Sequence, residues 1–243
     1  MQELFTTLFY QPLFNLLVWL YNVLPNHDLG LAIILLTVIV KVLLLPLSWK
    51  QVQAQAALQE LQPHIERLKD EHKDDKQALA QAQMKLFAEK KINPLSSCFP
   101  LLIQLPFLFA LFYVLSEGLK NGGSHAKILY PFIADPGKLN ETLLGLFSLT
   151  QSHNILLAVL NAVGQFVQTK MMTPVKPAAN EKKTEEKKED IASAMNQQML
   201  YVFPLMTGVM SYTFPSGLGL YFLVQTLVSV IQQKVFFVVM KKK

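Results

Sequence analysis

The stretch 30–48, GLAIILLTVIVKVLLLPLS, constrains this chain most, because it could cross a bilayer and yet contains a lysine. A transmembrane helix needs about 20 mainly apolar residues. A charge near the middle of such a helix costs roughly 2.5–3.5 kcal/mol on insertion scales. Lys41 should therefore face a protein interior or a water-filled cavity, and on a helix it shares a face with Thr37 and Ser48. The stretch predicts a membrane helix with a polar, positive stripe.

The composition also indicates an integral membrane protein. Of 243 residues, 51% are hydrophobic and only 16% are charged, whereas a soluble domain has about 25% charged residues. The single cysteine, Cys98, excludes a disulfide framework, and the sequence contains no CxxC spacing typical of a metal site. No histidine lies within a predicted span, which argues against a metal site in the membrane. Ser216 lies in a predicted external turn without a nearby base, which argues against an intramembrane hydrolase. We expect no enzyme activity, catalytic residue, metal or cofactor.

The alternation of apolar and polar runs predicts an all-α membrane protein, a five-transmembrane-helix bundle. The predicted spans are residues 30–48, 99–116, 154–172, 199–214 and 218–240. The other predicted segments are an external amphipathic interfacial helix at 1–25, a cytoplasmic helical hairpin at 49–91, an external loop at 117–152, a disordered cytoplasmic loop at 173–196 and a basic cytoplasmic tail at 241–243.

The N-terminal segment 4–24 has two interpretations. Its length and apolar content would allow a membrane span. However, Glu3, Thr7, Gln11 and Asn15 recur every four residues and form one polar stripe, which is typical of a helix lying in the membrane interface. We favour the interfacial helix and keep the spanning helix as the alternative.

The distribution of lysine and arginine predicts the orientation in the membrane. There are none before residue 30 and eight in the hairpin, three in the 117–152 loop and six in 170–196. The PSG turn at 215–217 has none, and four lie from Lys234 to the end. Basic residues mark cytoplasmic segments, so we expect a multi-pass membrane protein with a cytoplasmic C-terminus.

Most of the predicted spans carry polar residues at helical spacing, such as Gln225, Ser229 and Gln232 in 218–240 and Asn161, Gln165 and Gln168 in 154–172. One such stripe is commonly a hydrogen-bonded seam between helices, and Lys41 by itself could snorkel to the membrane surface. However, several spans carry such stripes, and no predicted span contains an acidic residue that could pair with Lys41. Together these observations favour a shared hydrophilic cavity. Such a cavity would attract a negatively charged group of another molecule.

Three segments resemble the YidC/Oxa/Alb membrane protein insertase family. NPLSSCFPLLIQLPFLFALFYVL (93–115) is similar to the family's second conserved span, and FPSGLGLYFLVQTLVSVIQQ (214–233) to its last. YQPLFNLLVWLYNVLPNHDLGLAIILLTVIVKVLLLPLS (10–48) is similar to its external interfacial helix and first conserved span. The chain resembles a bacterial member reduced to the insertase core, without the large periplasmic domain of some relatives. This resemblance implies that the protein lies in the bacterial cell (inner) membrane.

The resemblance implies a hydrophilic groove that opens to the cytoplasm and the lipid. The family places a basic residue, usually arginine, in that groove, where this chain has Lys41; lysine keeps the charge but not the fork-shaped guanidinium. Thr37 and Tyr221 match nearby family positions, and Gln165 and Gln168 are further candidates for the groove lining. Implied partners are nascent membrane proteins and the lipid bilayer, with the Sec translocon, the signal recognition particle or its receptor, and the ribosome as candidates; direct nucleic-acid binding is not expected.

The main alternative function is a secondary transporter with a polar site at the membrane midplane. Such a protein is expected to contain inverted repeats and broken helices around that site, and the sequence shows no convincing internal repeat. Solute flux into vesicles would indicate a transporter, whereas insertion of a nascent membrane protein would indicate an insertase.

Overall fold

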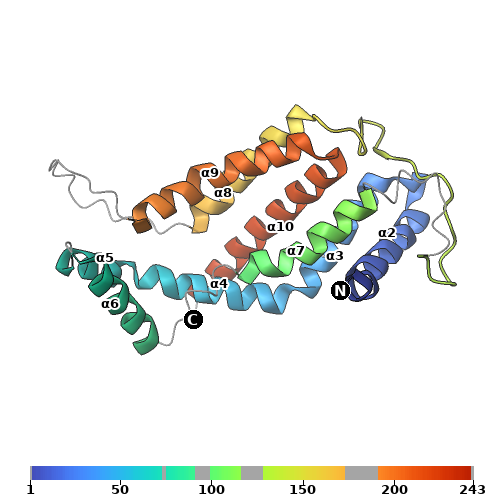
Figure 1. The fold of residues 1–243 in the computed structure, drawn as a ribbon. Coiled ribbons are helices and arrows are strands. Elements are labelled where there is room, and N and C mark those ends of the chain that lie inside the picture. Colours follow the sequence, from blue (N-terminus) through green and yellow to red (C-terminus); the bar gives the residue numbers. More distant parts are fainter. Residues whose placement is uncertain (1, 73–74, 91–98, 116–127, 173–190, 242–243) are drawn as a thin grey trace.

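The computed structural model describes residues 2–72, 75–90, 99–115, 128–172 and 191–241, and these residues are mostly helical (Figure 1). The elements are α1 (Gln2–Phe5), the π-helical turn η1 (Thr6–Tyr10), α2 (Gln11–Val23), the 3₁₀ turn η2 (Pro25–His27), α3 (Leu29–Leu43), α4 (Leu45–Glu60), α5 (Gln62–Glu71), α6 (Lys76–Glu89), α7 (Phe99–Tyr113), β1 (Thr142–Leu143), β2 (Phe147–Ser148), α8 (Ile155–Met172), α9 (Ile191–Thr213) and α10 (Ser216–Lys241).

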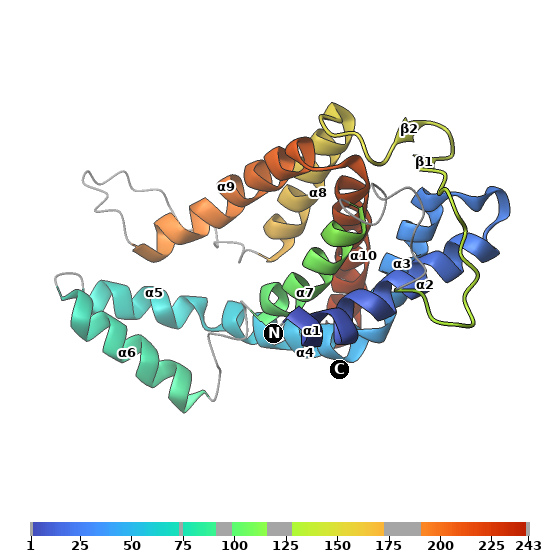
Figure 2. The ribbon, with the colours of Figure 1, turned by 45° about the vertical axis from the view of Figure 1, so that its right-hand side comes forward.

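Helix α10 lies at the centre of the bundle. It packs against α3 on one side and against the α8–α9 pair on the other, while α2 packs against α3 (Figures 1 and 2). Helices α4, α5 and α6 extend away from this bundle to one end of the molecule, and the 128–154 segment lies at the other end. The predicted helical architecture is confirmed at this level.

Two helical segments, Glu3–Val23 and Ser216–Val239, are by length and composition able to cross a membrane. The pair Leu29–Leu43 and Leu45–Glu60 would count as a third if the two form one bent span, and Gln104–Tyr113 and Ile155–Met171 are shorter apolar helices. The number of spans and their sides therefore stay predictions.

The predicted span 30–48 does not form one continuous helix, because the chain bends at Leu44. The helix axis bends by 65° between α3 and α4. Pro46 lies in the first turn of α4. Proline has no N–H to donate to the preceding turn and its ring crowds that turn. The bend redirects α4 toward the predicted hairpin.

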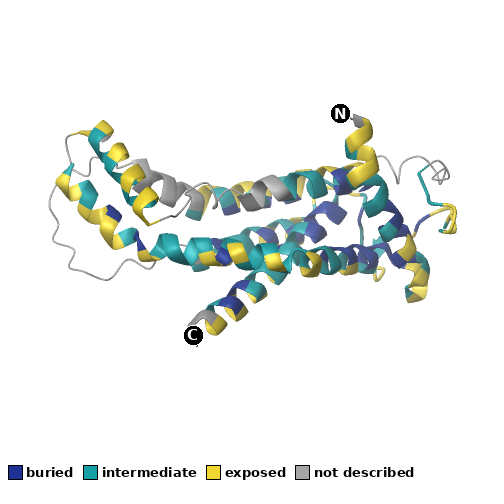
Figure 3. Cartoon of the chain, turned by 90° about the horizontal axis from the view of Figure 1, so that it is seen from below, coloured by how far each residue is buried: buried dark blue, intermediate teal, exposed yellow. Residues whose placement is uncertain are grey.

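Helices α5 and α6 form a helical hairpin within the predicted range 49–91. Asp75 caps α6 by accepting hydrogen bonds from the backbone N–H groups of Gln77 and Ala78, both at 2.9 Å. Figure 3 shows mostly exposed and half-buried residues along this hairpin. Residue 91 lies outside the described part of the chain.

Helix α9 begins at Ile191, inside the range 173–196 that was predicted to be a disordered loop. The sequence from 191 to 198, IASAMNQQ, contains several good helix formers and no charge, so the helix can extend back from the predicted span. The rest of that predicted loop, 173–190, lies outside the described residues, as do 116–127 of the external loop and 242–243 of the tail.

The polar stripe of the N-terminal helix divides into two parts. Glu3 and Thr7 are exposed, which fits either interpretation of this segment. Asn15, by contrast, is buried; its side chain donates to Ile128 O at 2.9 Å and accepts from Tyr130 N at 2.6 Å. This part of the stripe holds the 128–154 segment against α2.

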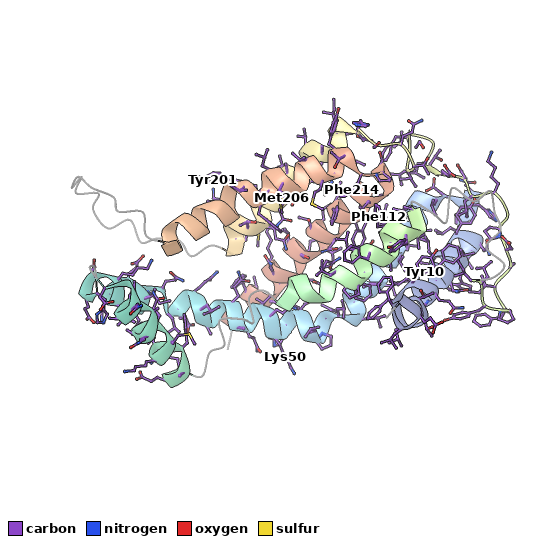
Figure 4. The ribbon with its side chains drawn as sticks, in the orientation of Figure 1. Tyr10, Lys50, Phe112, Tyr201, Met206 and Phe214 are labelled. Carbon is purple, nitrogen blue, oxygen red and sulfur yellow. The ribbon has the colours of Figure 1, made fainter. Side chains whose placement is uncertain are left out.

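A hydrophobic core joins α2, α3, α7 and the start of α10. Phe14, Ile33 and Leu218 are each at most 1% exposed within it. Aromatic rings extend the core outward: Phe112 on α7 makes an edge contact with Phe214 at 5.7 Å between ring centroids (Figure 4). This core fixes how α3, α7 and α10 face one another.

Candidate functional site

Lys41 lies in the last turn of α3 and is half-buried against α10. Its Nζ donates a hydrogen bond to Ser229 Oγ at 2.9 Å. Within the described part of the chain, Lys41 has no acidic partner. The lysine is thus held by an uncharged hydroxyl, which leaves its charge uncompensated.

Two further contacts connect α10 with α3 and α4, one on each side of the bend. Gln232 Nε2 lies 3.4 Å from the backbone oxygen of Lys41, close to the helix end, where carbonyl groups lose their intrahelical donors. Beyond the bend, the rings of Trp49 and Phe236 meet edge to face at 4.6 Å. These contacts fix the position of Lys41 relative to α10.

Helix α7 adds a third side to this site through Gln104. Its Nε2 donates to Gln225 Oε1 at 2.7 Å and to the hydroxyl of Tyr221. Because Tyr221, Gln225 and Ser229 follow one another at four-residue intervals, they share one face of α10. We call Lys41, Gln104, Tyr221, Gln225, Ser229 and Gln232 the polar cluster.

Thr37 and Tyr221 both line a small cavity of about 20 Å³ between α2, α3, α7 and α10, and their predicted role in a groove stays a prediction. Thr37 is buried, and its hydroxyl already donates to Ile33 O at 2.7 Å. The other lining residues are apolar: Leu13, Leu17, Leu36, Val40, Phe107, Leu111 and Val114. A cavity of this size has room for about one water molecule.

Gln165 and Gln168 lie on α8, and the described contacts do not connect them to the polar cluster. Gln165 contacts Thr169 on its own helix, at 3.4 Å between Nε2 and Oγ1. Gln168 is half-buried on the same face. Asn161, one turn before Gln165, makes the contact across helices, donating to Gly219 O of α10 at 2.9 Å.

Sequence reasoning found only part of this cluster. It selected Lys41 and Tyr221, which belong to the polar cluster, and Thr37, which lies outside it. It did not assign the stripe of Gln225, Ser229 and Gln232 to the site. It missed Gln104, which looked like an isolated glutamine between two prolines. The available signal was the i, i+4, i+7 spacing on the last helix, which is the face that meets Lys41.

A second hollow lies between α5 and α6 of the hairpin, with a volume of about 320 Å³. Leu68 and Leu86 contribute apolar surface to it, and charged residues of both signs surround them. The full lining consists of His64, Arg67, Leu68, Glu71, Ala82, Lys85, Leu86 and Glu89. Among the described residues, no group of three or more His, Cys, Asp or Glu side chains could hold a metal ion.

Known proteins resemble this chain over nearly its whole length. The family model described as "60Kd inner membrane protein" matches residues 19–243. A protein of Fusobacterium nucleatum named "Membrane protein insertase YidC" is 37% identical over 235 residues, which cover 96% of this chain and 97% of that relative. The chain belongs to the YidC/Oxa/Alb insertase family.

Other family members are longer than this chain. Proteins of the same name from Tolumonas auensis and Shewanella halifaxensis are 34% and 33% identical, and in each case 96% of this chain matches only 37% of the relative. A solved structure described as "Active YidC insertase crystal structure with the first transmembrane domain resolved" matches with a TM-score of 0.59 and 26% identity, over 91% of this chain and 45% of that one. These relatives lend no support to the transporter alternative.

Proposed function

We propose that this protein inserts nascent membrane proteins into the bacterial inner membrane and assists their folding. The observation that carries the proposal is Lys41, a half-buried cation held by Ser229 and without an acidic partner among the described residues. The match along nearly the full length of an insertase from Fusobacterium nucleatum supports the same function.

Lys41 would attract acidic residues near the span of an incoming substrate. Two unit charges 4 Å apart attract by about 1 kcal/mol in water but by about 4 kcal/mol at an effective dielectric of 20. A substrate carboxylate would therefore gain most where water is partly excluded, as at the polar cluster. Gln165 and Gln168 would extend the polar lining along α8 when a substrate separates α8 from α10.

The apolar part of the substrate would leave along the exposed side chains of α7 and α9. Tyr201 and Met206 on α9 are 58% and 48% exposed (Figure 4), and Phe109 on α7 is 50% exposed. Moving apolar surface out of water gains roughly 25 cal/mol per Å². This gain would drive release into lipid without ATP.

The proposed arrangement has five spans, with the hairpin and the C-terminus in the cytoplasm. Trp49 and the exposed Lys50 at the start of α4 (Figure 4) are the residue types that mark a membrane boundary. The mixed-charge hollow between α5 and α6 would then lie where substrates and targeting factors arrive. The Sec translocon, the signal recognition particle or its receptor, and the ribosome are the candidate partners there.

The test is insertion into proteoliposomes containing the purified protein. One single-span substrate would carry acidic residues ahead of its span, and a matched substrate would carry amides instead. We expect Lys41→Arg to preserve insertion of the acidic substrate and Lys41→Ala to slow it roughly tenfold, which corresponds to ~1.4 kcal/mol. Lys41→Glu should slow it further, because it replaces attraction by repulsion, and the amide substrate should respond less.

Two results would count against the proposal in different ways. If Lys41→Glu inserts the acidic substrate as fast as the unaltered protein does, the electrostatic role of Lys41 is wrong. If the unaltered protein inserts neither substrate above the level of empty liposomes, the insertase function itself is wrong.

A further inference from the structure

The 128–154 segment exposes three large apolar side chains outside any helix. Phe132 is 80% exposed, and Leu144 and Leu146 are 60% and 75% exposed. The two leucines flank Gly145 in the turn between β1 and β2, at the end of the molecule opposite the hairpin (Figure 2). Two leucines this exposed on one turn would gain free energy by leaving water.

The turn is held in a defined conformation by a buried carboxylate. Leu144 has a φ of +49°, a backbone region that a leucine rarely adopts. Its N–H donates to Asp28 Oδ2 at 2.5 Å, while Asp28 Oδ1 accepts from Leu31 N at 2.8 Å at the start of α3. Asp28 is only 3% exposed, so it links the turn rigidly to the first turn of α3.

The turn is also seated closely on α3. A Cβ atom at Gly30 would lie 2.4 Å from Leu143 Cδ1, so only glycine allows this approach. The backbone that carries Leu144 and Leu146 is therefore held in place against α3. The backbone strain at Leu144 persists because the surrounding structure holds it, which is typical of functional sites.

The position of the turn along the bundle indicates what covers it. It sits at the first turn of α3, where the apolar run of that helix begins. The apolar surface of α8 also begins at this end, with Ile155 and Leu156 exposed at 67% and 64%. In a protein whose helices cross a bilayer, this level is the membrane surface, so the turn continues an apolar surface that already faces lipid.

We propose that Leu144 and Leu146, together with Phe132, insert into the outer leaflet at the boundary between headgroups and acyl chains. The 128–154 segment is then a lipid anchor, and Asp28 is the positioning residue that aims its tip. This proposal goes beyond the insertase function, because it assigns a lipid-binding surface to a segment that takes no part in the polar cluster.

The experiment uses tryptophan fluorescence of the full chain in liposomes that contain brominated phospholipids. Trp19 and Trp49 are first replaced by phenylalanine, and a single tryptophan is then introduced as Leu146→Trp or Phe132→Trp. Lys138→Trp, at an exposed polar position of the same segment, is the matched control. We expect bromolipid quenching of the first two variants to be several-fold stronger than that of the control.

A second variant tests the role of Asp28 without relying on insertion activity. Adding Asp28→Ala to the Leu146→Trp chain should reduce the quenching, whereas Asp28→Asn, which keeps one acceptor oxygen, should reduce it less. If Leu146→Trp is quenched no more than Lys138→Trp and is open to aqueous iodide, the anchor is wrong. If it is shielded from both quenchers, a second copy or another protein covers the turn, which also overturns the proposal.

Discussion

Asn161 is fully buried where α8, α9 and α10 meet. Its Nδ2 lies 3.0 Å from Ser211 Oγ and 2.9 Å from Gly219 O, so one amide contacts both neighbouring helices. Side chains of this kind are favoured between membrane helices because lipid offers no competing partner. Gly219 makes the approach possible, since a Cβ at that position would lie 2.6 Å from Ser211 Oγ.

The variant Gly219→Ala should therefore destabilise the packing of α8, α9 and α10 around Asn161. The new methyl group would force Ser211 away from Asn161, and overpacking of this kind costs about 1–3 kcal/mol. Unfolding in mixed detergent micelles measures the loss. Gly164→Ala is the matched control, because its Cβ would lie at an ordinary 3.4 Å from Thr226 Cγ2; equal losses in both variants would contradict this interpretation.

At the scale of whole elements, the bend between α3 and α4 decides where the hairpin points. Trp49 lies just after the bend and packs edge to face on Phe236 of α10. The contact ties the direction of α4 to the C-terminal half of α10. An aromatic contact close to Lys41 thus helps to position the hairpin relative to the bundle.

Replacing Trp49 by alanine should loosen the hairpin while leaving the bundle folded. An aromatic pair contributes about 0.5–1.5 kcal/mol beyond its buried area. Spin labels at Gln81 on α6 and Leu227 on α10, in a Cys98→Ser chain, would report a broader distance distribution for Trp49→Ala than for the starting chain. Trp19→Ala, at a position that is 47% exposed on α2, should leave the distribution unchanged; an effect as large as that of Trp49→Ala would count against this role.

At the scale of the whole molecule, the two ends carry different surfaces. One end is the polar hairpin with its mixed charges, and the other is the 128–154 segment held onto α2 and α3. Asn15 and Asp28 fasten that segment by hydrogen bonds to its backbone. Contacts of this type use the backbone of the loop, so they do not depend on the identity of its side chains.

The proposed orientation predicts opposite accessibility for the two ends. In a Cys98→Ser chain, Lys138→Cys should react with a membrane-impermeant maleimide added to intact spheroplasts. Gln81→Cys on the hairpin should react only after the membrane is permeabilised. Both positions are exposed in the structure, so a difference reports the side of the membrane; labelling of Gln81→Cys in intact spheroplasts would reverse the predicted orientation.

Local patterns predicted the helices well, because apolar content and helical periodicity are properties of short segments. The range 154–172 corresponds closely to α8, and Lys41 was identified from the cost of a charge in an apolar helix. The same reasoning failed at Leu44, where Pro46 two residues later bends the helix, and at Ile191, where uncharged helix formers extend α9.

The sequence by itself determined which residues share a face, and the tertiary structure decided which faces meet. The stripe of α10 meets Lys41 and Gln104, the stripe of α8 meets α9 and α10 through Asn161, and half of the N-terminal stripe holds the 128–154 segment. These stripes look alike in the sequence because periodicity fixes only the direction of a side chain around its own helix. The partner of each stripe depends on how helices distant in the chain pack around one core. That packing placed Lys41 beside Ser229 and the other polar side chains of α10.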